Sequence, residues 1–253
     1  MQYDALVFSS GGARGAALLG AADVVARRPE YVGVRAFAGA SVGSIIAAGL
    51  ALGLTPGRMQ RATQRHPLQA VLSPESFGLN SGRELRAWIR RVLRLRSPVR
   101  LGDLPKELVV VACNVTSRRA QYWASSTHPE MDLLDALVAS CSVPLMFAGV
   151  TLDEALYVDG GVVDPFPTAH VAAMGYRVLG VRSEGGAGTP GSVAAFVTAL
   201  VDCVAHAAAA AAACDDMVIR TTVDPLDFGD AAVQRAEFAR GRRQAHAYFK
   251  KRD

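Results

Sequence analysis

The stretch FAGASVGSIIAAG, residues 37–49, places a small serine, Ser41, between Gly39 and Gly43. Apolar residues precede the serine and an Ala/Ile-rich run follows it, which predicts a strand that turns directly into a helix. Flanking glycines let the backbone pass closely beneath such a serine, so its hydroxyl stands free at the carboxyl edge of a sheet. The N-terminus of the following helix favours negative charge there. The stretch is therefore typical of a nucleophilic serine in an α/β protein.

The pattern G-x-S-x-G also has a plainer explanation. Five-residue motifs arise by chance, and serine is a favoured residue at the N-cap of a helix. Ser41 would then do no more than cap the helix that follows it. Two further glycine sites bear on the choice between a nucleophile and a cap.

The first glycine site is SSGGARG, residues 9–15, which also follows an apolar strand and opens a helix. The backbone N–H groups of Gly11, Gly12 and Ala13 are expected to point into one small space and to bind an anion. A dinucleotide site is the competing interpretation. Its fingerprint requires glycine where Ser10 stands and an acidic residue at the end of the second strand, but that strand ends in Phe-Ala-Gly. The sequence thus argues against a dinucleotide.

The second glycine site is YVDGGVVDPFP, residues 157–167, in which Asp159 ends a strand and two glycines follow. Taken alone, this is a common Asp-Gly turn. A nucleophilic serine, however, needs a group that takes its proton, and an acyl-transfer intermediate needs N–H donors for its oxyanion. Asp159 and the loop 9–15 supply these parts if all three sites lie at the carboxyl ends of parallel strands.

In this order and spacing, the three motifs resemble those of the patatin-like phospholipases. The matching segments are Ser10-Gly-Gly-Ala-Arg14-Gly15, Gly39-Ala-Ser41-Val-Gly43 and Asp159-Gly-Gly161. Residues 136–150, ALVASCSVPLMFAGV, are similar to the family's helix and proline turn before its aspartate strand. The resemblance covers about residues 3–183.

The resemblance implies a fold and an activity. The fold is a three-layer α/β/α domain over 1–253 with a mostly parallel central sheet, a core of about 3–183 and a helical part of about 184–253. The activity is that of a lipid acyl hydrolase, of the phospholipase A or lysophospholipase type, which cleaves esters of glycerophospholipids. The substrate is a phospholipid or lysophospholipid, and neither a cofactor nor a metal is implied.

The resemblance also assigns roles to residues. Ser41 is the nucleophile and Asp159 its general base, as a dyad without histidine. The oxyanion hole is framed by Gly11, Gly12, Ala13 and Arg14. The supporting glycines of the motifs are Gly15, Gly39, Gly43, Gly160 and Gly161.

Two other functions remain open from the sequence. An ordinary α/β-hydrolase would use a Ser-Asp-His triad, for which His170, His206 and His246 follow Asp159. Its nucleophile normally comes after more than the two strands that precede Ser41. A non-catalytic lipid-binding module that keeps the fold is the other alternative, and an ester assay separates it from an enzyme.

Composition supports a single large α/β domain. Of 253 residues, 51% are hydrophobic and 20% charged, which provides for a sizeable core. Expected strands lie at 3–8, 34–39, 107–115, 121–126, 156–161 and 176–183. Expected helices lie at 15–28, 44–53, 55–66, 81–96, 131–142, 167–175, 191–213 and 234–250. Strands that alternate with helices predict a mostly parallel sheet covered on both faces.

Charge and cysteine usage narrow the location and the partners. The net charge of +4 suits contact with anionic surfaces but is too small for a dedicated nucleic-acid binder. Four cysteines without a CxxC pair indicate neither zinc nor redox chemistry. No signal peptide is expected, and residues 192–214 predict a buried alanine-rich helix rather than a membrane span. The expected location is cytoplasmic, with peripheral contact with membranes, and the oligomeric state is open.

The predicted helix 81–96 has two contrasting sides. Leucine, tryptophan, isoleucine and valine gather on one side, and arginines gather on the other: Arg83, Arg86, Arg90 and Arg94, with Arg91 beside them. One interpretation is a surface helix whose arginines are solvated. The other is a basic face that meets anionic lipid head groups.

Overall fold

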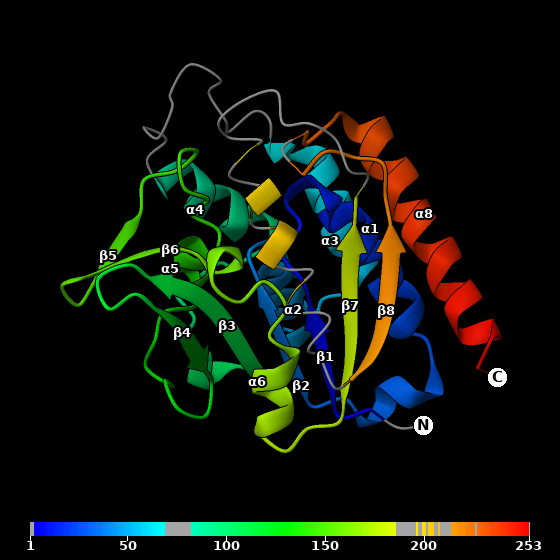
Figure 1. Ribbon diagram of the computed structural model, residues 1–253, viewed down its shortest axis with the longest axis horizontal. Coiled ribbons are helices and arrows are strands. Elements are labelled where there is room, and N and C mark those ends of the chain that lie inside the picture. Colours follow the sequence, from blue (N-terminus) through cyan, green and yellow to red (C-terminus); the bar gives the residue numbers. More distant parts are fainter. Residues whose placement is uncertain are drawn as a thin grey trace.

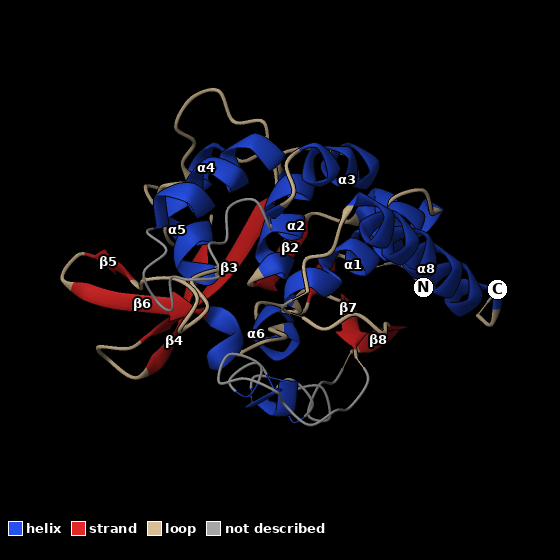
Figure 2. Ribbon diagram, turned by 90° about the horizontal axis from the view of Figure 1, so that it is seen from above, coloured by secondary structure: helices blue, strands red, loops and turns tan. Residues whose placement is uncertain are grey.

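The structure is a computed structural model that describes residues 3–68, 82–185, 214–225 and 227–252, together with 196, 199–200, 202–204 and 207. A mixed sheet, mostly parallel in its centre, runs through the molecule with helices on both faces (Figures 1 and 2). The predicted α/β architecture is confirmed.

The sheet has the strand order β5-β6-β3-β2-β1-β7-β8, with β4 paired to β3. The strands β3, β2, β1, β7 and β8 are parallel to one another. Strands β4 and β6 run antiparallel to β3, and β5 runs antiparallel to β6. The strands are β1 (Ala5–Phe8), β2 (Ala36–Ala40), β3 (Glu107–Asn114), β4 (Arg119–Ala124), β5 (Val150–Leu152), β6 (Ala155–Asp159), β7 (Val178–Glu184) and β8 (Asp215–Arg220).

The helices lie unequally on the two faces of the sheet. Figure 2 shows α6 on one side and the other labelled helices on the opposite side. Their bounds are α1 (Gly15–Val25), α2 (Val42–Ala51), α3 (Pro56–Arg65), α4 (Gly82–Val92), α5 (Leu133–Ser140), α6 (Thr168–Ala173) and α8 (Ala231–Lys250). Short 3-10 turns are η1 (Gly12–Arg14), η2 (Pro29–Gly33), η4 (Leu101–Asp103) and η5 (Gly160–Val162).

Alternating side chains of the central strands pack into two separate hydrophobic cores, one on each face of the sheet. In β1, Leu6 and Phe8 join the large core beneath the many helices, whereas Ala5 and Val7 join a smaller core with Val171 of α6. A strand that is buried on both faces must be apolar throughout, as the run ALVF is. Within the described residues, the sheet thus carries one thick and one thin helical layer.

The part after residue 183 differs from the helical part that was expected. Strand β8 extends the sheet there, next to β7. The sequence did not predict it because Asp215 and Asp216 open it, and acidic residues are rare in strands. Both carboxylates have partners in the fold: Asp215 accepts from the Tyr3 hydroxyl, and Asp216 pairs with Arg182. Most of the expected helix 191–213 lies outside the described residues.

Helix α4 is shorter than predicted. It ends at Val92 rather than at residue 96, and Arg94 has a positive φ of 56°, which a helix does not accommodate. Its apolar side is buried as expected, with Leu85, Trp88 and Ile89 in the large core. Residue 81, at which the helix was expected to begin, lies outside the described residues. In the described part of the chain, no helix has the length and apolar character that crossing a membrane requires.

Candidate active site

Ser41 occupies a strained turn between β2 and α2. Its φ of 54° and ψ of −131° lie in a region that residues with a side chain rarely adopt. Only glycine fits on either side: a Cβ on Gly39 would lie 2.4 Å from the Gly43 carbonyl carbon, and one on Gly43 would lie 2.5 Å from the Phe8 carbonyl oxygen. The spacing G-x-S-x-G therefore reflects close backbone packing around a strained serine.

The side chain of Ser41 does not cap helix α2. The strain is supported by main-chain contacts instead. The Ser41 N–H donates to the Ser140 hydroxyl at 3.0 Å, and the Ser44 hydroxyl donates to the Ser41 carbonyl at 2.6 Å. The explanation of Ser41 as a helix cap is therefore wrong. No local sequence motif indicates Ser140, because it lies 99 residues from Ser41 in the sequence.

Asp159 lies near Ser41, but the direction of its strand differs from the expected one. It ends β6, which is antiparallel to β3, so the expectation that all three motifs follow parallel strands is wrong for this residue. In the sheet register, Ala40 pairs with Val111 and Asp159 pairs with Ala112. Asp159 therefore lies two strands away from the end of β2, at the same level of the sheet.

The carboxyl of Asp159 is buried, at 4% exposure, and only partly paired. The Gly161 N–H donates to Oδ1 at 2.7 Å, while Oδ2 has no hydrogen-bond partner among the described residues. Burial raises the pKa of Asp159 to about 6, against the opposing effects of the nearby Ser41 hydroxyl and the Gly161 N–H. Ser41 is thus close enough to stabilise the carboxylate without a fully formed hydrogen bond, which is common for catalytic pairs without substrate.

Asp159→Asn is expected to raise the free energy of unfolding at pH 8 by up to about 3 kcal/mol, the equivalent of the pKa shift. A carboxyl whose pKa rises on folding from 3.8 to about 6 contributes stability below pH 3.8 that is lost as the pH rises through 6. Asparagine does not titrate, so the advantage of the variant should shrink towards pH 4. Urea unfolding at pH 4 and pH 8 measures this difference, and a gap that does not change with pH contradicts it.

The glycine-rich loop offers fewer free N–H groups than expected. The Ala13 N–H donates to the Pro225 carbonyl at 2.8 Å, and the Arg14 N–H donates to the Gly11 carbonyl at 3.0 Å. Within the described part of the chain, the N–H groups of Gly11 and Gly12 carry no hydrogen bond. Gly12 has a φ of 52°, and a Cβ there would lie 2.1 Å from the Pro225 oxygen. Gly11 and Gly12 are therefore the members of the loop whose amides are free for an anion.

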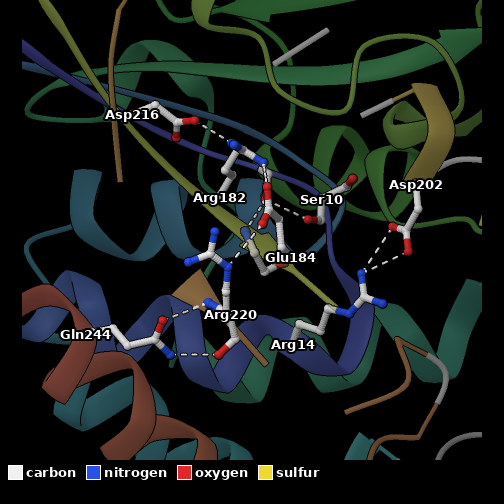
Figure 3. Close-up of polar contacts among 10 residues, drawn as sticks. Ser10, Arg14, Arg182, Glu184, Asp202, Asp216, Arg220 and Gln244 are labelled. Atoms are coloured by element: carbon white, nitrogen blue, oxygen red, sulfur yellow. Dashed lines mark hydrogen bonds and ion pairs between the residues drawn. The ribbon is translucent and has the colours of Figure 1, made fainter. Parts of the chain in front are cut away.

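The side chain of Arg14 is engaged away from the loop. Its guanidinium donates to the Val223 carbonyl at 3.2 Å and forms an ion pair with Asp202 at 2.9 Å (Figure 3). The side chain is 5% exposed. Arg14 thus fastens the loop to the C-terminal part of the chain, a role that no local sequence pattern could have indicated.

Ser41 opens into a mainly apolar pocket of about 780 Å³, a volume that includes its open mouth. Gly12 and Ala13 of the glycine-rich loop line the same pocket, as do apolar side chains such as Leu19, Leu85 and Trp88. Ser41 itself is buried, at 7% exposure. The pocket therefore brings the serine, the loop and an apolar wall to one place.

The histidines considered for a triad lie elsewhere or outside the described residues. His170, on α6, stacks on Tyr122 with ring centroids 3.7 Å apart, and burial lowers its pKa. His246 is exposed on α8, and His206 lies outside the described residues. Nor do the described residues hold a cluster of three or more side chains suited to a metal ion.

The chain is similar in sequence or in fold to several known proteins. The chain is 27% identical over 181 residues to the probable lipid hydrolase 463L of invertebrate iridescent virus 6, which covers 65% of this chain and 62% of that protein. It is 29% identical over 174 residues to the human patatin-like phospholipase domain-containing protein 4, and the match covers 66% of this chain and 68% of that protein. Among solved structures, VipD from Legionella pneumophila superimposes with a TM-score of 0.72 at 16% identity, over 99% of this chain and 67% of that one.

The chain spans about three fifths of the length of the viral relative. The similarity to VipD shows the fold. A family model for patatin-like phospholipases matches residues 6–172, which contain all three glycine motifs. The chain belongs to the patatin-like phospholipase family.

Proposed function

We propose that the protein is a lipid acyl hydrolase that cleaves carboxylic esters with Ser41 as nucleophile and Asp159 as general base. The arrangement around Ser41 carries this proposal. The residue is strained and does not cap its helix, it lies beside a buried carboxyl, and it lines an apolar pocket. With a pKa of about 6, the Asp159 carboxyl is largely ionised at pH 7 and can accept a proton. Its pKa is also close enough to pH 7 for it to release that proton again.

In the proposed reaction, the Ser41 hydroxyl attacks the ester carbonyl and its proton passes to Asp159. The N–H groups of Gly11 and Gly12 stabilise the oxyanion, since they are free in the described structure. The alcohol leaves with the proton from Asp159, and the acyl group remains on Ser41. Asp159 then takes a proton from water, which attacks the acyl ester, and the fatty acid departs as Ser41 regains its proton.

The pocket favours the acyl chain of a lipid as the part of the substrate that is bound. No charged residue lies on its described wall, so the transfer of an apolar chain from water into the pocket is favourable. We propose glycerophospholipids and lysophospholipids as substrates. Mass spectrometry of fatty acids released from phosphatidylcholine vesicles and from lysophosphatidylcholine micelles tests this; release of neither fatty acid contradicts it.

Two other functions have less support. A Ser-Asp-His triad would need an imidazole near Asp159, but His170 is held in a stack on the thin side of the sheet. A lipid-binding module without catalysis would have no need of the strained backbone at Ser41. Neither alternative explains a buried, half-paired carboxyl beside the serine.

We further propose that the basic side of α4 contacts anionic lipid, with a different set of arginines from that suggested by periodicity. Arg86 is engaged within the fold, in ion pairs with Asp132 and Asp135 of the segment that begins α5. Arg90 donates to the carbonyls of residues 95 and 96, which follow the end of its own helix. Of the five arginines expected on the basic side, the exposed ones left for a surface are Arg83 and Arg91 on α4 and Arg94 just after its end.

Changing Arg83, Arg91 and Arg94 to glutamine is expected to weaken binding to phosphatidylserine-containing vesicles, because each basic residue near such a surface contributes about 1 kcal/mol. The loss should be largest at low salt. Vesicle co-sedimentation at two ionic strengths measures it. The matched control changes the exposed Arg118, Arg119 and Arg243. Equal losses in both triple variants would indicate net charge rather than a docking face.

A further inference from the structure

Two buried glutamine oxygens on the wall of the pocket have no partner. Gln60 lies on α3 and is 4% exposed, and Gln234 lies on the first turn of α8. Both side chains line the pocket that Ser41 opens into. The Oε1 atom of each is buried and accepts no hydrogen bond from any described residue. An unpaired buried acceptor is costly, so two of them in one pocket indicate a missing donor.

The orientation of both amides is determined by backbone contacts. Nε2 of Gln60 donates to the Gln234 carbonyl at 3.1 Å, and Nε2 of Gln234 donates to the Phe228 carbonyl at 3.2 Å. Turning either amide over would set oxygen against oxygen. The hydroxyl of Thr63, which also lines the pocket, donates to the Gln60 carbonyl at 2.9 Å. The two Oε1 atoms are therefore acceptors without a donor on this wall, while each amide has one N–H hydrogen engaged by a backbone carbonyl.

The chemistry of the rest of the wall selects the kind of donor. Leu19, Leu85 and Trp88 line the same pocket, and its described wall includes no carboxylate. An ammonium group would lose its hydration there without a counter-charge, whereas a neutral hydroxyl loses much less. A hydroxyl on an otherwise apolar chain satisfies the acceptors and fills the apolar space.

We propose that the pocket is specific for acyl chains that carry a hydroxyl group, which donates to Oε1 of Gln60 or Gln234. This inference rests on the proposed function, since the hydroxyl belongs to the acyl chain of the ester that Ser41 attacks. Because the hydroxyl is not a reacting group, its contact forms in the bound substrate and in the transition state alike. The preference therefore lies in KM, with kcat nearly unchanged.

The first experiment compares p-nitrophenyl decanoate with the p-nitrophenyl esters of 3-, 8- and 10-hydroxydecanoic acid on the wild-type protein. At least one hydroxylated ester is expected to have a kcat/KM about tenfold above that of the plain ester, because the plain chain leaves both acceptors unpaired. If the plain ester is the best substrate of the four, the inference is wrong. This comparison needs no variant and so does not depend on how well a variant folds.

The second experiment changes each glutamine to methionine, which keeps the length of the side chain and removes the acceptor. Gln60→Met and Gln234→Met are expected to lose the preference for the hydroxylated ester over the plain ester, measured as the ratio of the two kcat/KM values on each variant. The control is Gln244→Met on α8, the helix that also carries Gln234. The Gln244 side chain accepts from the Arg220 N–H and donates to the Arg220 carbonyl, and it does not line the pocket (Figure 3). Retention of the full preference by both pocket variants would overturn the inference.

A binding measurement separates this inference from the proposed function. Calorimetry with Ser41→Ala compares the affinity for decanoic acid with the affinity for the three hydroxydecanoic acids, and no catalysis is involved. The best hydroxylated acid is expected to bind about tenfold more tightly. If the wild type hydrolyses no ester but this binding preference is present, the proposed function fails and the specificity stands. Equal affinities for all four acids would refute the specificity even where esters are hydrolysed.

Discussion

Replacing Ser41 with alanine is expected to lower kcat/KM for ester hydrolysis by about 10³-fold or more, equivalent to about 4 kcal/mol of transition-state stabilisation. The variant loses the only atom that can form the acyl intermediate in the proposed reaction. The fold should persist, because the contacts that hold the turn are made by the Ser41 backbone with Ser140 and Ser44. Circular dichroism and turnover of p-nitrophenyl butyrate measure the two effects.

Ser142→Ala is the matched control for Ser41→Ala. Ser142 is also buried, but its hydroxyl donates to the Val138 carbonyl at the end of α5 and does not line the pocket. Its turnover should stay within a few-fold of the wild type. Near-normal turnover by Ser41→Ala would show that another residue is the nucleophile.

The second large effect is an asymmetry between Asp159→Asn and His170→Ala. Asp159→Asn keeps an acceptor for the Gly161 N–H but cannot take a proton, so activity should fall by about 10³-fold. His170→Ala removes a ring that stacks on Tyr122, which affects packing on the thin side of the sheet and leaves the pocket unchanged. Its activity should remain within a few-fold of the wild type.

Parallel assays of the two variants at pH 8, where the Asp159 carboxyl is ionised in the wild type, make this comparison. Unfolding curves establish that both variants are folded. If His170→Ala loses as much activity as Asp159→Asn, a triad with histidine replaces the proposed dyad.

Local sequence patterns were sufficient for the elements that carry the site. The alternation of apolar strands with helices predicted the α/β sheet, and the two glycines around Ser41 predicted a strained turn because only glycine tolerates that backbone approach. The direction of β6 could not be predicted in this way. Strand pairing depends on contacts between distant segments, so the antiparallel pairing of Asp159 opposite Ala112 became evident only in the structure.

Long-range polar contacts were the other part that the sequence did not reveal. Arg14 reaches Asp202, 188 residues away, and the Ala13 N–H is taken by the Pro225 carbonyl. Both partners lie in the C-terminal part, beyond the motifs. Periodicity likewise placed Arg86 on a solvated basic face, although its ion pairs with Asp132 and Asp135 need the fold to bring α4 and α5 together.

The central claim is that Ser41 is an activated nucleophile, and covalent labelling tests it most directly. A fluorophosphonate reacts with a serine hydroxyl that a neighbouring base activates, and the phosphonyl group remains attached to the serine oxygen. Peptide mapping by mass spectrometry is expected to find one adduct, on Ser41, in the wild type and none in Ser41→Ala. An adduct on another residue, or no adduct in a folded wild-type protein, would contradict the account.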